Sequence, residues 1–200
     1  MFIELTDHLR CPADHPEAFL VLLPDEVVDR TVRAGVLGCP VCRREYRIRD
    51  GVAELHDEAE AIGVDAGSRG APIDGSALAA FLGLGGPGGY VVLVGTAADR
   101  WEPAAEAMGG VHLVAVNPTR PVPASLRASP VRAGRIPLKA RSVRGVVLGA
   151  GYAADPAWRR EAIRVTLPGL RVVGESAEPP GEEGIEPLAS AGGWWVARRR

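Results

Sequence analysis

The three cysteines of the chain have a spacing that suits a metal ion. Cys39 and Cys42 form a C-x-x-C corner, and Cys11 lies about 28 residues earlier and is followed by proline. Two such corners, each built on a tight turn, can present thiolates to one tetrahedral Zn²⁺. His15 or Asp14 can supply the fourth ligand, and imidazole suits zinc beside thiolates better than a single carboxylate does. The sequence therefore predicts a structural zinc site formed by Cys11, His15, Cys39 and Cys42.

Two other interpretations of the cysteines stay open. They can be buried free thiols in a module that has lost its metal and kept its fold. A redox role for the C-x-x-C corner is disfavoured because no thioredoxin-like βαβ pattern surrounds it. Three cysteines also exclude a framework of two disulfides.

The elements that must position these cysteines belong to a short N-terminal segment. Residues 1–55 have their own turn residues and contain every cysteine. A module of this size buries little apolar surface and usually needs a metal or a disulfide. Residues 56–75 are acidic at first and then rich in Gly, Ala and Ser, which is typical of a linker. We therefore expect a zinc-ribbon-like module at 1–55, a linker at 56–75 and a second domain at 76–200.

Short apolar runs alternate with helical stretches in the second domain. The pattern predicts strands at 90–94, 111–116, 145–148 and 170–173, helices near 76–82, 100–108 and 155–163, and a closing hairpin that contains 194–196. Ser76 is the expected N-cap of the first helix. Strands that alternate with helices in this way favour a parallel sheet of βαβ units. Prolines at 118, 121, 123 and 130 leave room for at most a short turn of helix after the second strand. The expected fold class is α/β, with a small zinc-ribbon-like module and a reduced Rossmann-like domain whose sheet is mostly parallel.

The composition narrows the class of protein. A net charge of −2 argues against a dedicated nucleic-acid-binding protein, although the basic stretch at 132–144 leaves nucleic acid open as a weaker partner. No apolar run approaches the roughly 18 residues that span a membrane. Glu4 stands where a signal peptide would carry a basic residue. We expect a soluble cytoplasmic protein.

Three segments of the N-terminal module carry a more specific motif. They are Leu-Thr-Asp-His-Leu-Arg-Cys-Pro at 5–12, Gly-Cys-Pro-Val-Cys at 38–42 and Tyr-Arg-Ile-Arg-Asp-Gly-Val at 46–52. Together they resemble the methyltransferase-activator zinc-ribbon family (the Trm-one-twelve-like proteins). The resemblance covers about 55 residues and departs at Asp14, where the family usually has its second cysteine. Members of that family bind and stabilise methyltransferases, so the resemblance implies a protein partner or a methyltransferase-like domain in the same chain.

The second domain carries three weaker motifs in a fixed order. They are Val-Val-Leu-Val-Gly at 91–95, Ile-Pro-Leu at 136–138 with the run at 142–148, and Pro-Gly-Leu-Arg-Val-Val at 168–173. In this order they resemble class I S-adenosylmethionine-dependent methyltransferases. The resemblance implies that Gly95, Thr96, Asn117 and Ile136 contact S-adenosylmethionine if the cofactor is bound.

Several positions that hold the cofactor in that family carry other residues here. The glycine-rich loop corresponds to residues 95–99, where only the first glycine is kept. Asn117 stands where a carboxylate accepts both ribose hydroxyls. Three further acids of the family correspond to Leu93, Arg132 and Arg144. The loss of two charge-assisted hydrogen bonds weakens binding about a hundredfold or more.

These losses favour a methyltransferase-like protein with a degenerate cofactor site that acts as a scaffold or regulatory partner. The alternative is an active, divergent S-adenosylmethionine-dependent methyltransferase with its activator module fused in cis. A nucleic-acid-binding module is a third interpretation. We identify no catalytic set in the sequence, and His112 is expected to be a packed residue of its strand.

Overall fold

The computed structural model describes residues 1–56, 73–176 and 181–200. Most of the linker expected at 56–75 lies outside these residues. Within the described residues, no helix has the length and apolar character needed to cross a bilayer.

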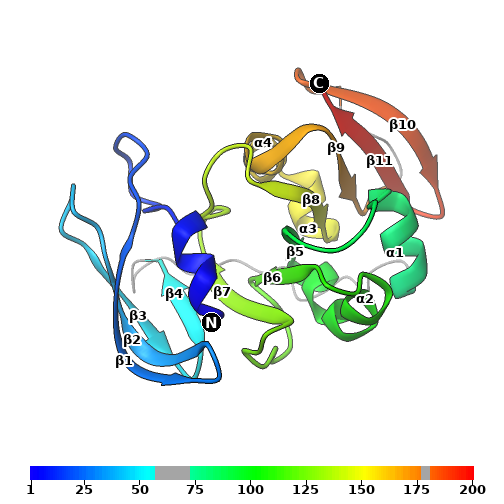
Figure 1. The fold of residues 1–200 in the computed structure, drawn as a ribbon. Helices are drawn as coiled ribbons and strands as arrows, with labels where there is room; N and C mark the ends of the chain where they lie inside the picture. The colour runs from blue at the N-terminus through cyan, green and yellow to red at the C-terminus, as the bar shows by residue number, and fades with distance from the viewer. Residues whose placement is uncertain (57–72, 177–180) are drawn as a thin grey trace.

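A mixed β-sheet runs through the whole described part of the chain (Figure 1). Its strands are β1 (Val21–Val28), β2 (Thr31–Gly38), β3 (Glu45–Arg49), β4 (Val52–Leu55), β5 (Tyr90–Val94), β6 (His112–Val116), β7 (Ala128–Ala133), β8 (Val143–Leu148), β9 (Thr166–Gly174), β10 (Ile185–Ala191) and β11 (Trp194–Arg199). Their order across the sheet is β1-β2-β3-β4-β7-β6-β5-β8-β9-β11-β10.

The middle of the sheet has the Rossmann-like arrangement that the sequence predicts. Neighbouring strands from β7 through β6, β5 and β8 to β9 are all parallel. Counted from β5 along the chain, they stand in the order third, second, first, fourth, fifth, which is the doubly wound order. The winding therefore reverses between β5 and β8, and the carboxyl ends of these two strands mark the topological switch point.

The N-terminal module continues the same sheet. Residues 53–55 of β4 pair in parallel with residues 131–133 of β7. Figure 1 shows the blue and cyan strands β1 to β4 beside β7. Buried side chains of the module, including Leu5, Leu9 and Leu37, belong to the same apolar cluster as Val92 and Val146 of the parallel strands. The module and the Rossmann-like part thus share one sheet and one core.

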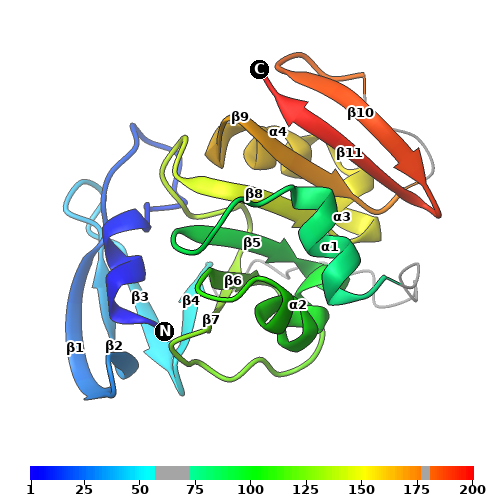
Figure 2. The same ribbon diagram turned by 45° about the vertical axis from the view of Figure 1, so that its right-hand side comes forward.

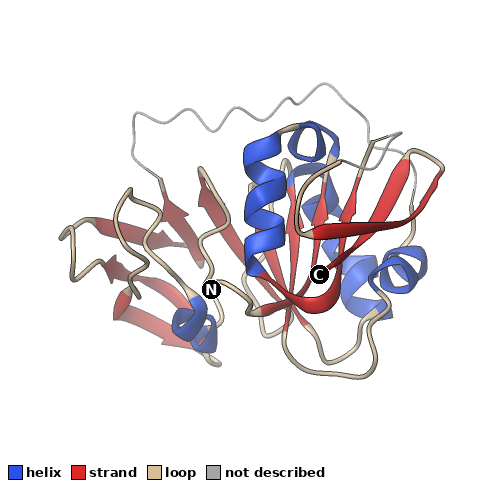
Figure 3. Ribbon diagram, turned by 90° about the horizontal axis from the view of Figure 1, so that it is seen from above, coloured by secondary structure: helices blue, strands red, loops and turns tan. Residues whose placement is uncertain are grey.

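Helices cover both faces of the parallel strands (Figures 2 and 3). The helices α1 (Gly75–Leu82) and α2 (Trp101–Ala107) pack with Val91 and Leu93 of β5. The helices α3 (Ala150–Ala154) and α4 (Pro156–Val165) pack on the opposite face with Val92 and Val94. The 3₁₀ helix η1 (Ile3–His8) adds Leu5 to that second core. Because both faces are covered, the sequence of β5 is a continuous apolar run and does not alternate between apolar and polar residues.

Local signals explain most element ends. Asp155 caps α4 by accepting from Ala157 N–H at 2.7 Å, as the Asp-Pro start predicts. The cap of α1 is Asp74, which accepts from Ala77 N–H at 2.7 Å, so the expectation of Ser76 at this position is wrong by two residues. The closing hairpin is present as β10 and β11. Among residues 117–127 no helix occurs, as the prolines indicate.

Candidate functional site

Two backbone turns bring the predicted metal ligands together. Cys39 and Cys42 lie in the turn after β2, where Arg43 N–H donates to the Cys39 carbonyl at 2.9 Å. Arg43 has a left-handed backbone with φ of 60°, which closes the turn tightly. Cys11 follows η1, and its N–H donates to the Ala18 carbonyl at 3.0 Å, which closes the loop that carries His15.

The spacing of the four ligand atoms matches a zinc tetrahedron. The ligand atoms of Cys11, His15, Cys39 and Cys42 all lie within 4.8 Å of one another. Cys11 Sγ is 3.7 Å from Cys42 Sγ, and Cys39 Sγ is 3.4 Å from His15 Nε2. Tetrahedral zinc with bonds of about 2.3 Å to sulfur requires sulfur–sulfur separations of about 3.8 Å. Asp14 is exposed and lies outside this cluster, so the geometry favours His15 as the fourth ligand.

Polar neighbours orient the ligands. His15 Nδ1 lies 2.7 Å from the Pro16 carbonyl, an arrangement that protonates Nδ1 and leaves the Nε2 lone pair directed at the thiols. The buried Tyr46 hydroxyl is 3.3 Å from Cys11 Sγ and can donate to it. Such outer contacts fix the tautomer of a metal-binding histidine and stabilise thiolates.

The thiols of the cluster differ in acidity. Burial raises the pKa of Cys11 to about 11. Burial also acts to raise the pKa of Cys39, but hydrogen bonds from the backbone N–H groups of Cys42 and Val41 and from the neighbouring thiols outweigh it and lower that pKa to about 7. Cys39 therefore ionises more readily than Cys11 near neutral pH, and a metal ion that binds here must displace the proton of Cys11.

A tyrosine ring packs against the backbone of Gly95 at the switch point. Gly95 directly follows β5 and has a left-handed φ of 63°. A Cβ at this position would lie 2.5 Å from two ring atoms of Tyr152. Tyr152 projects from α3, is 8% exposed, and packs edge-on against Trp158 at 4.5 Å between centroids. The conformational freedom of Gly95 is therefore used by a side chain of the protein itself.

The next residue of this loop is also engaged internally. The loop forms the 3₁₀ helix η2 (Gly95–Arg100). Thr96 Oγ1 donates to the buried Glu175 carboxylate at 3.3 Å. The same carboxylate oxygen accepts from Ala150 N–H at 3.2 Å, which ties the start of α3 to the end of β9. The loops at the carboxyl ends of β5, β8 and β9 are thus bonded to one another.

The side chains of Asn117 and Asp99 form hydrogen bonds with backbone groups of neighbouring segments. The Asn117 amide donates to the Ala133 carbonyl at 2.8 Å and accepts from the Ala133 N–H at 2.9 Å, so both of its polar atoms join the ends of β6 and β7. Asp99 Oδ1 accepts from the backbone N–H groups of Thr119 and Arg120 at 2.8 and 2.9 Å. The side chains of Asn117 and Asp99 therefore hold neighbouring backbone segments together through hydrogen bonds.

The other residues predicted to correspond to cofactor-binding positions pack in the core or bond to other parts of the chain. Ile136 is fully buried, and its carbonyl accepts from Arg164 at 2.9 Å. Leu93 is fully buried in the core beneath α1 and α2. Arg132 is exposed and lies 3.7 Å from Glu54. Arg144 donates to the carbonyls of residues 85–88 and braces the turn before β5.

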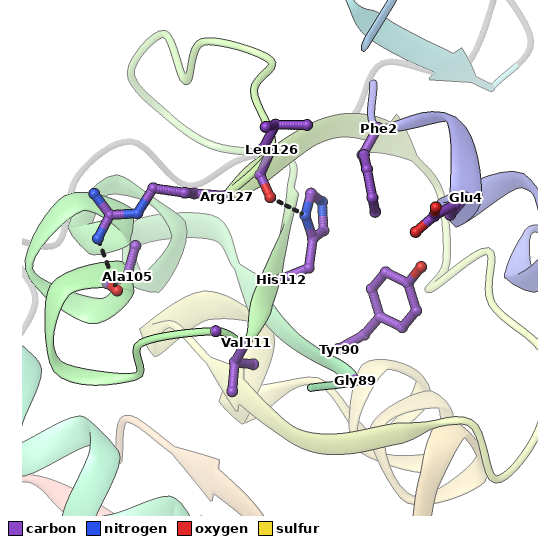
Figure 4. Close-up of a pocket in the computed structure, with 10 residues that line it drawn as sticks. Phe2, Glu4, Gly89, Tyr90, Ala105, Val111, His112, Leu126 and Arg127 are labelled. Atoms are coloured by element: carbon purple, nitrogen blue, oxygen red, sulfur yellow. Dashed lines mark hydrogen bonds between the residues drawn. The ribbon is translucent and has the colours of Figure 1, made fainter. Parts of the chain in front are cut away.

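A cavity of about 300 Å³ lies at the amino ends of β5 and β6 (Figure 4). His112 lines it with its Nδ1 at 3.0 Å from the Leu126 carbonyl and its Nε2 at 2.9 Å from Ser129 Oγ. The ring stacks on Phe2 at 4.8 Å and meets Tyr90 edge-on at 5.6 Å. Both ring nitrogens are bonded, so His112 is a packed residue as the sequence predicts.

The burial of His112 makes a pH-dependent contribution to stability. Burial lowers its pKa to about 4 in the folded chain, against about 6.5 when unfolded. Below pH 6.5 the unfolded chain takes up a proton that the folded chain refuses, so the free energy of unfolding falls as the pH drops from 6.5 to 4. The loss from this group reaches about 3 kcal/mol and is absent above pH 6.5. Urea unfolding from pH 7 to 4 should show a shallower slope for His112→Gln than for the parent chain, and parallel profiles would contradict the assignment.

Three residues of these sites were not identified from the sequence. Each of them contacts a residue more than thirty positions away in the chain. These contacts are Tyr46 with Cys11, Tyr152 with Gly95 and Glu175 with Thr96. Tyr46 opens the motif at 46–52, but that motif does not indicate a contact with Cys11, and Tyr152 and Glu175 belong to none of the motifs identified above. Only the packing of the sheet brings them to the metal cluster and to the switch point.

Comparison with known proteins gives little further guidance. No family model matches the chain, and no curated protein matches it in sequence. Among solved structures, the chain is similar to a SAM-dependent methyltransferase from Aquifex aeolicus, at 14% identity and a TM-score of 0.42, over 61% of this chain and 86% of that one. The fold assignment rests on the strand order described above.

Proposed function

We propose that the chain is a methyltransferase-like protein that holds a structural zinc ion, has a cofactor crevice closed by its own side chains, and acts as a scaffold or regulatory partner of another protein. The contact between the Tyr152 ring and Gly95 carries the proposal. Cofactor binding at a doubly wound sheet requires close approach to the backbone at this loop. A ring in van der Waals contact with the loop excludes that approach.

The polar groups around the crevice support the same conclusion. Thr96 bonds to Glu175, and Asn117 bonds to Ala133 through both amide atoms. A ribose or a methionine tail would have to break these bonds to form its own. Each exchange gives little net free energy, because a buried group left unpaired costs about 1–3 kcal/mol.

The proposed metal has a structural role. Three thiols and one imidazole would fill all four positions of a tetrahedral zinc ion and leave none for water or a substrate, which is typical of structural sites. When bound, zinc would crosslink the Cys11 loop to the turn after β2. This crosslink stabilises a module whose outer strand packs little apolar surface.

Exposed apolar side chains on the outer strand support a protein partner. Phe19, Val21 and Leu23, which alternate with the residues between them, are 56%, 54% and 62% exposed, and Val27 and Val28 of β1 are 44% and 43% exposed. Apolar side chains gathered on one exposed edge are typical of protein interaction sites. Pro24 and the register shifts beside it disfavour edge-to-edge pairing of β1 with a second copy of itself.

The alternative is an active, divergent methyltransferase. It is favoured by Gly95, which keeps a left-handed conformation at the switch point, and by the position of Tyr152 on a helix of only five residues. A ligand can displace a side chain on so short a helix at modest cost. In that case the closed crevice is the resting state of an enzyme.

Calorimetric titration of the zinc-loaded chain with S-adenosylhomocysteine distinguishes the scaffold from the active methyltransferase. The scaffold proposal predicts no binding tighter than a Kd of about 1 mM. Micromolar binding would contradict it and support the enzyme. The zinc content, measured on the same sample, confirms that the module is loaded in either case.

A further inference from the structure

A carboxylate lies in the loop that carries two of the proposed zinc ligands. Glu17 stands two residues after His15, and the bond from Cys11 N–H to the Ala18 carbonyl closes the loop around it. A metal ion bound to Cys11 and His15 would tie this loop to the turn after β2 and so restrict the positions that Glu17 can reach. The Glu17 side chain is about half exposed, so its place depends on the loop and not on burial in the core.

The Glu17 carboxylate joins this loop to the Rossmann-like part. Its Oε2 accepts from Ala140 N–H at 3.3 Å and lies 3.4 Å from Nη1 of Arg164, which is in the last turn of α4. Its Oε1 lies 3.4 Å from Nε of Arg10, a residue that is almost fully buried. One carboxylate of the metal loop therefore contacts the segment before β8 and a helix that covers the parallel strands.

Two guanidinium groups share this carboxylate. Burial lowers the pKa of Arg10, Glu17 opposes this shift, and the charge of Arg164 adds to it. Arg164 also pairs with Glu161 of its own helix at 2.9 Å. For Arg10, Glu17 is the one carboxylate at ion-pair distance among the described residues. Loss of Glu17 from its place would leave a buried charge without a counter-ion, which is strongly destabilising. The position of α4 beside the module therefore depends on Glu17.

The other end of α4 contacts the ring that lies against Gly95. Trp158, in the first turn of α4, packs edge-on against Tyr152 of α3 at 4.5 Å between centroids. A single residue, Asp155, separates the two helices, which lie side by side (Figures 1 and 2). A shift of α4 therefore moves the helix that carries Tyr152. Contiguous contacts of this kind carry coupling when the element between two sites has two arrangements.

We propose that occupancy of the metal site controls the crevice at Gly95, and that Glu17 and Arg164 transmit the effect. With the metal bound, Glu17 holds α4 in place and the Tyr152 ring stays against the loop. Without the metal, the loop releases Glu17, Arg10 loses its counter-ion, and α4 loosens together with α3. This inference rests on the proposed function, because it assumes a bound zinc ion and a crevice closed by the ring.

Coupling between two sites is reciprocal, so a change on α4 must alter the affinity for zinc. Competition with a chromophoric chelator measures this affinity on the full chain. Arg164→Gln should weaken zinc binding about tenfold, which is within the usual range of coupling between sites. Arg160→Gln removes the same charge from the exposed surface of the same helix and should leave zinc binding unchanged.

The partner residue provides the second variant. Glu17→Gln should weaken zinc binding about as much as Arg164→Gln, and the double variant should bind no more weakly than either, because both substitutions break one contact. Glu17 is half exposed, so its variant should fold even if Arg164→Gln does not. Unchanged zinc affinity in Glu17→Gln, an equal loss in Arg160→Gln, or additive losses in the double variant would overturn the proposal.

Titration with S-adenosylhomocysteine at saturating zinc tests whether the effect reaches the crevice. Glu17→Gln should bind this ligand with a Kd of about 1 mM or tighter, whereas Arg160→Gln should show no binding in this range. Equal binding in the two variants would overturn control of the crevice. Absence of zinc from the parent chain, or micromolar binding of the ligand by the zinc-loaded parent chain, would instead contradict the proposed function.

Discussion

Replacing Cys39 with serine is expected to abolish stoichiometric zinc binding and to destabilise the chain by about 4 kcal/mol or more. The substitution removes a thiol whose pKa is lowered to about 7, from a cluster whose atoms have the spacing of a zinc tetrahedron. Zinc held at a thousand times its Kd adds about 4 kcal/mol to the free energy of unfolding, all of which is lost with the site. Elemental analysis and urea unfolding measure the two effects on the same preparation.

Variants of the adjacent residues His15 and Asp14 test the assignment of the fourth zinc ligand. His15→Asn should lose zinc, because its Nε2 faces Cys39 Sγ at 3.4 Å. Asp14→Asn should keep zinc, because Asp14 lies outside the cluster. Full zinc in Cys39→Ser, or loss of zinc in Asp14→Asn alone, would show that the ligands have been assigned wrongly. Chelation of the parent chain should reproduce the stability of Cys39→Ser.

Replacing Tyr152 with alanine is expected to lower stability and to open the crevice at Gly95. The ring is nearly buried and contacts both Gly95 and Trp158, so its removal should cost about 3–5 kcal/mol. The space that it leaves lies at the switch point, where S-adenosylhomocysteine should then bind with a Kd of about 1 mM or somewhat tighter. The affinity stays low because Asn117 and Thr96 remain engaged with Ala133 and Glu175.

Tyr152→Phe is the control for this experiment. It keeps the ring over Gly95, so it should bind no more S-adenosylhomocysteine than the parent chain. Calorimetry measures the binding, and thermal unfolding measures the stability. If Tyr152→Ala is folded and binds the ligand no better than Tyr152→Phe, the ring is not what closes the crevice.

The sequence predicts those parts of the fold that depend on local signals. Continuous apolar runs mark β5 and β6, and Asp155-Pro156 marks the start of α4. The strand β7 was not predicted, because it is made of small residues with Pro130 in its middle. It forms a strand because β4 and β6 pair with its two edges. The parallel pairing of β4 with β7 has no local signal either.

The same division applies to the candidate sites. The cysteine spacing, together with the preference of zinc for imidazole, predicts the four residues that the structure brings together. The sequence also indicates that the loop at 95–99, which resembles a cofactor loop, keeps only its first glycine. The contacts of Tyr152 with Gly95 and of Glu175 with Thr96 could not be predicted, because each joins residues that are far apart in the chain.

The pairing of β4 with β7 has a consequence for synthesis of the chain. Ala53 pairs with Val131, so the N-terminal strands leave the ribosome about 80 residues before their partner is available. At typical elongation rates this interval is about 4–16 s, during which β4 exposes an unpaired edge. Capture of the proposed zinc ion would need only residues 11–42 and would occur early in this interval. The metal would then hold the nascent module in shape until the rest of the sheet arrives.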